Sequence, residues 1–244
     1  MPVVAASTAA AVALAAAQAV TFNTKDGWTL AAKYRPAAPG KAVVVLAHGV
    51  GSASDEWASF GEDLARRGIG TLAVDLRGHS GSQAGPSGPR AWPTFDATGE
   101  WPRAAEDLRA AAGWLEKKGV PAWRIGFGGA SVGADLASVV AAERKSAPFL
   151  LLLSPAENYR GAVLKLRKGL PTLAAAAPAD GYSYIAVRRI EAEKTGAVRY
   201  APAGHGVQML SDPATLKAAL DWVASARLTP PAPAAPKAAS PPKK

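Results

Sequence analysis

The feature that most constrains the fold of this chain is the segment Gly128-Gly129-Ala130-Ser131-Val132-Gly133, which contains the pattern Gly-x-Ser-x-Gly. A short apolar run at 124–127 precedes it, and the alanine-rich residues 132–143 are typical of a helix. Small residues allow the backbones of a strand and a helix to approach closely at a sharp turn. Such a turn holds the serine hydroxyl above the edge of a sheet, whereas the alternative is a glycine-rich turn with an incidental serine.

Strand and helix patterns alternate along most of the chain. The expected strands are residues 21–23, 28–35, 42–47, 69–74, 124–127, 149–153, 172–176 and 197–200. The expected helices are residues 55–67, 103–118, 132–143, 183–195 and 212–225. Asp26-Gly27, between the first two strands, is typical of a hairpin turn. Alternation at this spacing predicts an α/β fold, with a mostly parallel twisted sheet and helices on both faces.

The two ends of the chain differ in composition from the residues between them. Residues 1–19 carry no charged side chain, and Ala17-Gln18-Ala19 fits a signal-peptidase site. We predict a cleaved export signal at 1–19, one α/β domain at 20–228, and an extended, disordered Pro/Ala/Lys tail at 229–244. The alternative for 1–19 is a disordered alanine-rich leader. Export would place the mature chain in the periplasm or outside the cell, with no stable membrane insertion.

Composition excludes several kinds of site. The absence of cysteine excludes disulfides, thiolate metal sites and a cysteine nucleophile. The net charge is +9, and four of the basic residues cluster between Arg160 and Lys168. A nucleic-acid groove usually combines such a cluster with several exposed aromatics, whereas only Tyr159 lies nearby. We therefore interpret the cluster as a solvated face and expect no nucleic-acid partner.

A serine hydroxyl needs a base that takes its proton during attack. Of the three histidines, His205 follows the last expected strand and stands between two glycines, which favours a loop that delivers the ring to Ser131. An orienting carboxylate should lie between them in the chain, at the end of a strand. Asp180 and Glu157 both fit; Asp180 is favoured by its adjacent glycine and its shorter side chain, although it could instead cap the following helix.

Acyl transfer also requires two backbone N–H donors for the negative charge that develops on the carbonyl oxygen. Val132 follows the serine at a helix N-terminus, where N–H groups lack intrahelical acceptors. The second donor should come from the glycine-rich loop 48–52 after an expected strand, where Val50 is the best candidate. His48 is expected to support this loop rather than to act as a base.

Together these features resemble the α/β-hydrolase family over roughly residues 21–226. The matching pieces are His48-Gly49, the run Asp75-Leu76-Arg77-Gly78-His79-Ser80-Gly81-Ser82, the turn at Ser131, Asp180 and His205. The resemblance implies that Ser131, Asp180 and His205 are nucleophile, acid and base. It implies structural or pocket roles for Arg77 and His79. The spacing between turn and acid is similar to that of dienelactone-hydrolase-like members, which use cysteine where this chain has serine.

The segment between the expected strands 149–153 and 172–176 is too short for a large cap domain. Only residues 154–171 separate them, enough for a loop and about one helix, so the site should be open. Residues 83–101 form the other candidate cover. The aromatics Trp92, Phe95 and Trp101 either line an acyl pocket there or only pack this loop onto the domain.

The sequence therefore predicts a serine hydrolase that cleaves a small carboxylic ester through an acyl-enzyme, with no metal or organic cofactor. An amidase, thioesterase or peptidase with the same three residues is the first alternative. A hydrolase-like binding protein without catalysis is the second. Oligomeric state is left open by the sequence.

Overall fold

Strand β3 (Val43–Ala47) runs through the middle of the sheet and is buried on both faces. Val43, Val45 and Ala47 pack into one apolar cluster, whereas Val44 and Leu46 pack into a second one on the opposite face. Successive side chains of a strand point to opposite faces, so a continuous apolar run fits a strand that is covered on both sides. The alternating cluster membership shows that each face of the sheet carries its own core.

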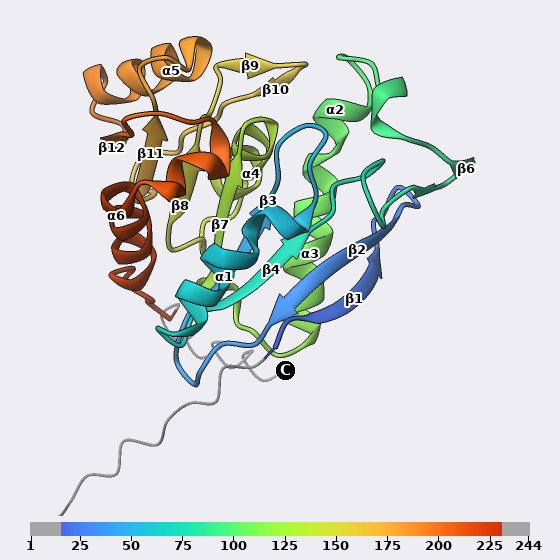
Figure 1. Ribbon diagram of the computed structural model, residues 1–244. Coiled ribbons are helices and arrows are strands. Elements are labelled where there is room, and N and C mark those ends of the chain that lie inside the picture. Colours follow the sequence, from blue (N-terminus) through green and yellow to red (C-terminus); the bar gives the residue numbers. More distant parts are fainter. Residues whose placement is uncertain (1–15, 231–244) are drawn as a thin grey trace, which may run out of the picture.

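The computed structural model describes residues 16–230, and its ten-stranded sheet has the order β12-β11-β8-β7-β3-β4-β2-β5-β6, with β1 beside β2 (Figure 1). The strands from β12 to β4 are parallel, and those beyond β4 pair in antiparallel fashion. The remaining strand bounds are β1 (Gln18–Asn23), β2 (Thr29–Arg35), β4 (Gly70–Val74), β5 (Ala84–Gly85), β6 (Gly88–Pro89), β7 (Ile125–Ala130), β8 (Leu150–Leu153), β11 (Thr172–Ala176) and β12 (Ala197–Tyr200).

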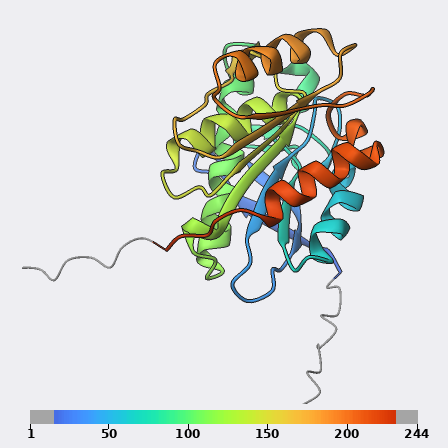
Figure 2. The same ribbon diagram turned by 90° about the vertical axis from the view of Figure 1, so that its left-hand side faces the viewer.

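Helices cover both faces of this sheet (Figure 2). One face packs against residues of α3, α4 and α5, and the other against residues of η1, α1 and α6. The bounds are η1 (Ser54–Trp57), α1 (Ala58–Ala65), α2 (Glu100–Arg103), α3 (Ala105–Lys117), η3 (Ala122–Arg124), α4 (Val132–Glu143), α5 (Gly181–Ala192) and α6 (Pro213–Ala224). The predicted α/β fold with a mostly parallel sheet is confirmed.

The strand before Ser131 is longer than its apolar run suggests. It continues to Ala130, because Gly129 pairs with Ala47 of β3 and Ala130 pairs with Leu153 of β8. Three glycines in this strand lower its local β-propensity, and tertiary pairing on both sides outweighs that preference. The serine therefore follows the sheet directly, without an intervening loop.

The connection between β8 and β11 holds a small hairpin, β9 (Asn158–Tyr159) with β10 (Ala162–Val163), and not the helix that its length allowed. Asn158 accepts the N–H of Gly161, whose φ of 81° lies in the left-handed region that favours glycine. The hairpin was missed because it pairs only two residues from each strand. The other short elements are η2 (Trp92–Thr94) and η4 (Gly206–Ser211).

The sheet begins inside the segment predicted as an export signal. Gln18 pairs with Tyr34 and Ala19 pairs with Lys33, so the antiparallel pairing of β1 with β2 starts before the predicted domain boundary at residue 20. Residues 1–15 of the predicted signal and residues 231–244 of the predicted tail lie outside the described residues. Among the helices of residues 16–230, none has the length and apolar character to cross a membrane.

Candidate active site

Ser131 lies on the turn between β7 and α4, in a backbone conformation that costs energy. Its φ of 54° and ψ of −129° are unusual for a residue with a side chain. A Cβ at Gly129 would lie 2.1 Å from the carbonyl oxygen of Gly133, and a Cβ at Gly133 would lie 2.4 Å from the carbonyl oxygen of Ala47. The two glycines are needed because strand and helix backbones approach each other too closely for any side chain.

The ring of His205 contacts the carboxylate of Asp180. His205 Nδ1 lies 2.9 Å from Asp180 Oδ1 and 3.0 Å from Oδ2, although the two residues are on separate loops. Asp180 is the residue before α5, but its side chain forms no cap for that helix. The other candidate acid, Glu157, pairs instead with Arg189 at 2.8 Å. Of the two carboxylates, the structure places Asp180 against the histidine.

A buried serine directly after β8 holds the loop that carries His205, called the histidine loop below, in place. The Oγ of Ser154 accepts the N–H of Gly206 at 2.7 Å, and Ser154 is itself almost fully buried with a φ of 53°. A Cβ at Gly206 would lie 3.2 Å from the Cβ of Ala130, so the histidine loop packs beside the residue that precedes Ser131. Sequence reasoning missed Ser154, because the signal for its role is a contact between residues far apart in the chain.

The loop after β3 presents one free N–H beside the serine. A Cβ at Gly49 would lie 3.4 Å from the Cβ of Ser131. The N–H groups of Gly49 and Gly51 donate to Glu56 and to Nε2 of His79, respectively. Within residues 16–230, the N–H groups of Val50 and Val132 have no hydrogen-bond acceptor. Both predicted donors are therefore unpaired within this range; Val50 lines the cleft, whereas Val132 is buried directly after Ser131.

His48 supports this loop from inside the protein. The buried ring accepts the N–H of Leu76 at Nε2, at 2.9 Å, and its Nδ1 lies 2.7 Å from the carbonyl oxygen of Gly49. This pattern requires a neutral ring with its proton on Nδ1. Burial lowers the pKa of His48 to about 4, which keeps the ring neutral across the physiological range. His48 is placed as a support and not as a base.

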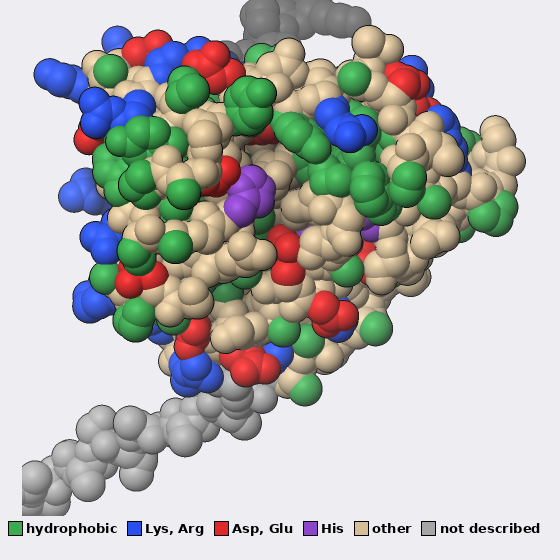
Figure 3. Space-filling view, turned by 45° about the horizontal axis from the view of Figure 1, so that its top comes forward, with side chains coloured by type: hydrophobic (Ala, Val, Ile, Leu, Met, Phe, Trp, Pro, Cys, Tyr) green, Lys and Arg blue, Asp and Glu red, His purple; other side chains and the backbone are tan. Residues whose placement is uncertain are grey.

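Ser131, Asp180 and His205 line one cleft of about 670 Å³, and Figure 3 shows the hollow with a histidine exposed at its edge. The carboxyl ends of parallel strands meet at one edge of a sheet, and the cleft lies at that edge. Tyr159 from the small hairpin and the highly exposed Tyr182 from α5 also line it. No helical cap covers the cleft in the described part of the chain.

Glu56 is a further acidic residue of this cleft that sequence reasoning missed. It sits inside the amphipathic segment 55–67, where charged residues are expected to face solvent. The first turn of that segment is the 3-10 helix η1, which turns the carboxyl toward the loop after β3. Burial raises the pKa of the Glu56 carboxyl, against the lowering effect of hydrogen bonds from Ser52 and Gly49 and of the nearby charge of His205.

The aromatic residues of the 83–101 loop pack the domain instead of lining this cleft. Phe95 and Trp101 are almost fully buried in the same core as α3, and Trp92 stacks on His79 at 5.5 Å between ring centroids. None of the three is among the residues that line the cleft. Of the two alternatives for these side chains, the structure supports packing.

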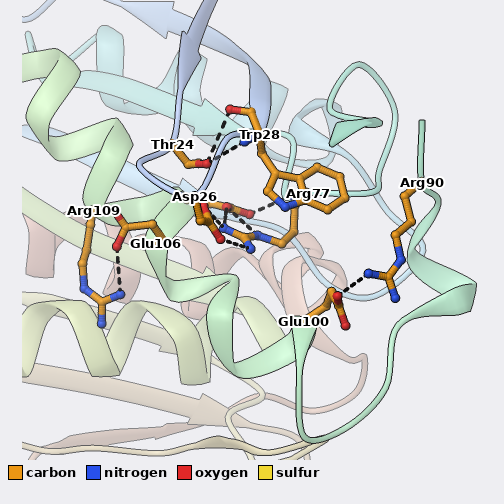
Figure 4. Close-up of polar contacts among 9 residues, drawn as sticks. Thr24, Asp26, Trp28, Arg77, Arg90, Glu100, Glu106 and Arg109 are labelled. Carbon is orange, nitrogen blue, oxygen red and sulfur yellow. Dashed lines mark hydrogen bonds and ion pairs between the residues drawn. The ribbon is translucent and has the colours of Figure 1, made fainter. Parts of the chain in front are cut away.

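The run 75–82 is held by a buried ionic network (Figure 4). Arg77, with a side chain only 1% exposed, donates from Nε to Asp107 and from its terminal nitrogens to Asp26. The backbone N–H of Arg77 donates to the second oxygen of Asp107, at 2.8 Å. Arg77 also lies over the ring of Trp28, so its role in the described structure is to anchor this loop.

Asp135 is a buried carboxyl, like Asp107, and it is hydrogen-bonded to Ala156, which lines the cleft. Asp135, one turn into α4, accepts the N–H of Ala156 at 3.0 Å, and its other oxygen has no partner among the described residues. Burial raises the pKa of Asp135 to about 8, far above its ordinary value of 3.8. Folding therefore retains a proton that the unfolded chain loses, and stability falls with rising pH between these values by about 1.4 kcal/mol per pH unit.

Replacing Asp135 with asparagine should remove this pH dependence. The Asn amide keeps an acceptor for Ala156 but does not titrate, so its advantage over wild type should grow from about pH 5 to about pH 8. Urea unfolding at both pH values measures the difference. Ser138→Ala on the same helix is the control, because a hydroxyl does not titrate and its effect should be the same at both pH values. An Asp135→Asn effect independent of pH would contradict the prediction.

Comparison with known proteins adds a family match. Residues 38–224 match the model of the family described as serine aminopeptidase, S33. None of the curated proteins compared with the chain matches it. Among solved structures, the chain is similar to the α/β hydrolase GrgF from Penicillium sp. sh18, with a TM-score of 0.70, 15% identity, and 86% of this chain and 98% of that chain covered.

Two other solved structures show the same likeness. A Pyrococcus furiosus esterase aligns with a TM-score of 0.63 and 18% identity, over 85% of this chain and 90% of that chain. A dienelactone hydrolase from Anabaena variabilis aligns with a TM-score of 0.59 and 19% identity, over 86% of this chain and 96% of that chain. At these identities the likeness shows a shared fold, whereas the family match covers most of the chain.

Proposed function

The chain belongs to the α/β-hydrolase family, and from this premise we propose that it is a serine hydrolase that cleaves small carboxylic esters through an acyl-enzyme. The observation that carries the proposal is the contact between His205 and Asp180 in the cleft that Ser131 also lines. A carboxylate on Nδ1 leaves Nε2 as the basic nitrogen of the ring.

In the proposed reaction, Ser131 Oγ attacks the ester carbonyl while Nε2 of His205 takes the hydroxyl proton. Asp180 accepts the hydrogen bond from Nδ1–H and stabilises the imidazolium that forms. Collapse of the tetrahedral intermediate breaks the bond to the alkoxy oxygen, which receives the proton from Nε2 and leaves as alcohol. Water then attacks the acyl-enzyme by the same route and releases the acid and the free serine.

The negative charge on the carbonyl oxygen would be bound by two backbone N–H groups, from Val50 and Val132. Support for this assignment is the position of both groups beside Ser131 and their lack of an acceptor within residues 16–230. Val132 is the first residue of α4, so the dipole of this helix adds to the stabilisation of the anion.

A fluorophosphonate probe tests the nucleophile. It should label the wild-type protein covalently and leave Ser131→Ala unlabelled, because only an activated serine is phosphonylated at a useful rate. Intact-protein mass spectrometry measures the adduct, and circular dichroism checks that the variant is folded. A wild-type protein that stays unlabelled would favour a hydrolase-like binding protein without catalysis.

The same probe distinguishes the two candidate acids. Asp180→Asn should slow labelling by orders of magnitude, since an amide no longer favours the required tautomer of His205. Glu157→Gln is the matched control, because it removes an exposed carboxylate that pairs with Arg189 outside the cleft lining. Slow labelling of Glu157→Gln with normal labelling of Asp180→Asn would assign the acid to Glu157.

Peptide cleavage is the second candidate, because the matching family is described as serine aminopeptidase. Amidase and thioesterase activity would use the same three residues with another leaving group. Esters are favoured because an alkoxy oxygen can leave with only partial proton transfer from the general acid, whereas an amide nitrogen must be protonated before its bond to the acyl carbon breaks. Comparison of kcat/KM for matched aryl esters, thioesters and peptide amides separates these activities.

A further inference from the structure

The charges of the cleft are opposite in sign to the charge of the whole chain. The chain has a net charge of +9, but the cleft is lined by the carboxylates of Glu56 and Asp180 and by no lysine or arginine of the described residues. Figure 3 shows acidic surface bordering the histidine at the hollow. Asp180 is already in contact with His205, which leaves the carboxylate of Glu56 as the charge not yet accounted for.

Glu56 has a fixed position, and the group that can carry a positive charge beside it is His205, whose ring is already hydrogen-bonded to Asp180. It lies on η1, which is anchored by the fully buried ring of Trp57, and its Oε1 accepts the N–H of Gly49 at 3.1 Å. Within residues 16–230 no lysine or arginine forms an ion pair with it. The preceding residue, Asp55, is 70% exposed and pairs with Lys33, so the two adjacent carboxylates differ in surroundings and partner.

A half-buried carboxylate is unfavourable unless a cation pairs with it, and His205 is shared with Asp180 and forms no ion pair with Glu56. The loop contact with Gly49 needs only an acceptor oxygen, which a glutamine would supply without the cost of a charge. Burial also raises the pKa of Glu56, which reflects the reduced hydration of its charge. A cation that enters the cleft would offset this cost, whereas a neutral substrate would not.

We infer that Glu56 is a specificity-determining residue that binds a positively charged amine of the substrate. The substrate class is then an ester with an ammonium or quaternary ammonium group close to the carbonyl that Ser131 attacks. This inference rests on the proposed function for the reaction itself. The pairing of the cation with Glu56 does not depend on turnover and is measured separately.

Isosteric substrate pairs isolate the charge. One pair places it on the alcohol side, 2-trimethylammonioethyl acetate against 3,3-dimethylbutyl acetate. The other places it on the acyl side, 4-nitrophenyl 4-(trimethylammonio)butanoate against 4-nitrophenyl 5,5-dimethylhexanoate. The measured quantity is kcat/KM for the cationic ester divided by kcat/KM for its neutral isostere. In at least one pair this ratio should exceed one for wild type, and Glu56→Gln should lower it by about tenfold.

Asp55→Asn is the matched control, since it removes the same charge one residue away, where the carboxylate pairs with Lys33. Its ratio should equal that of wild type. Added salt should reduce the wild-type ratio and leave that of Glu56→Gln nearly constant, because only a charge pair is screened. Equal ratios for wild type and Glu56→Gln in both pairs would overturn the inference and leave Glu56 as a support of the loop.

Binding without turnover keeps the inference apart from the proposed reaction. In the Ser131→Ala background, calorimetry should show tighter binding of the cationic ester of the preferred pair, and adding Glu56→Gln should abolish the difference. If Glu56→Gln abolishes the binding preference for the cationic ester but wild type hydrolyses neither ester, the proposed reaction is contradicted and the cation site is retained. Turnover without any cationic preference in binding or kcat/KM would contradict the cation site and retain the reaction.

Discussion

Replacing Ser131 with alanine is expected to lower kcat/KM for an aryl ester by about 10⁴- to 10⁶-fold, the largest effect of any single substitution in this chain. Its hydroxyl is the only group of the protein that forms a bond to the acyl carbon in the proposed reaction. His205→Ala should cost nearly as much, because a serine without its base is a poor nucleophile. Steady-state hydrolysis of a 4-nitrophenyl ester measures both.

The double variant Ser131→Ala/His205→Ala gives the sharper result. If the two residues act as one unit, the second substitution should add little to the first, since the remaining rate comes from the N–H donors and from binding. Ser87→Ala, an exposed serine outside the cleft lining, is the control and should keep full activity. Losses that multiply in the double variant would show that Ser131 and His205 act independently.

The second large effect is on stability. Replacing Asp107 with alanine should lower the free energy of unfolding by about 3–5 kcal/mol, because it leaves Arg77 with a buried charge and unpaired donors. Asp107 is fully buried and accepts from both the side chain and the backbone of Arg77. Burial opposes the charge on Arg77, but the two carboxylates outweigh it and raise its pKa, so the arginine cannot become neutral. Chemical denaturation measures the loss.

Two variants show whether the lost pairing is the cause. Asp26→Ala should cost less, because the Asp26 side chain is 37% exposed and water can solvate what the substitution leaves behind. The double variant Arg77→Met/Asp107→Leu should recover much of the loss by replacing the ion pair with apolar side chains. A double variant as unstable as Asp107→Ala would show that the carboxylate matters for another reason, such as its bond to the Arg77 backbone.

Much of the fold follows from local patterns in the chain. The helix over 132–143 and the strands over 172–176 and 197–200 have the bounds expected from the sequence. The helix begins after a serine and the strand 197–200 begins after a glycine, whereas the strand 172–176 is a weak, alanine-rich pattern that follows a proline; all of these signals are local. The β9–β10 hairpin and the extension of β7 to Ala130 escaped prediction, because each depends on pairing between residues that local pattern does not connect.

The candidate site divides in the same way. Ser131 stands out in the sequence because its turn needs small residues on both sides, and His205 stands out between two glycines. Ser154 and Glu56 carry no such local signal, since one follows an apolar strand and the other begins an amphipathic helix pattern. Their places are visible only through contacts with Gly206 and Gly49.

By itself, the sequence determined the alternation of strands and helices, the turn at Ser131 and the order of serine, acid and histidine along the chain, because these depend on neighbouring residues. Tertiary structure decided which carboxylate meets His205. Asp180 and Glu157 both follow strands, and only the packing of α5 and the histidine loop brings Asp180 to 2.9 Å while Arg189 pairs with Glu157. The physical reason is that a hydrogen bond between two loops requires the whole sheet to set their separation, and no local pattern encodes that distance.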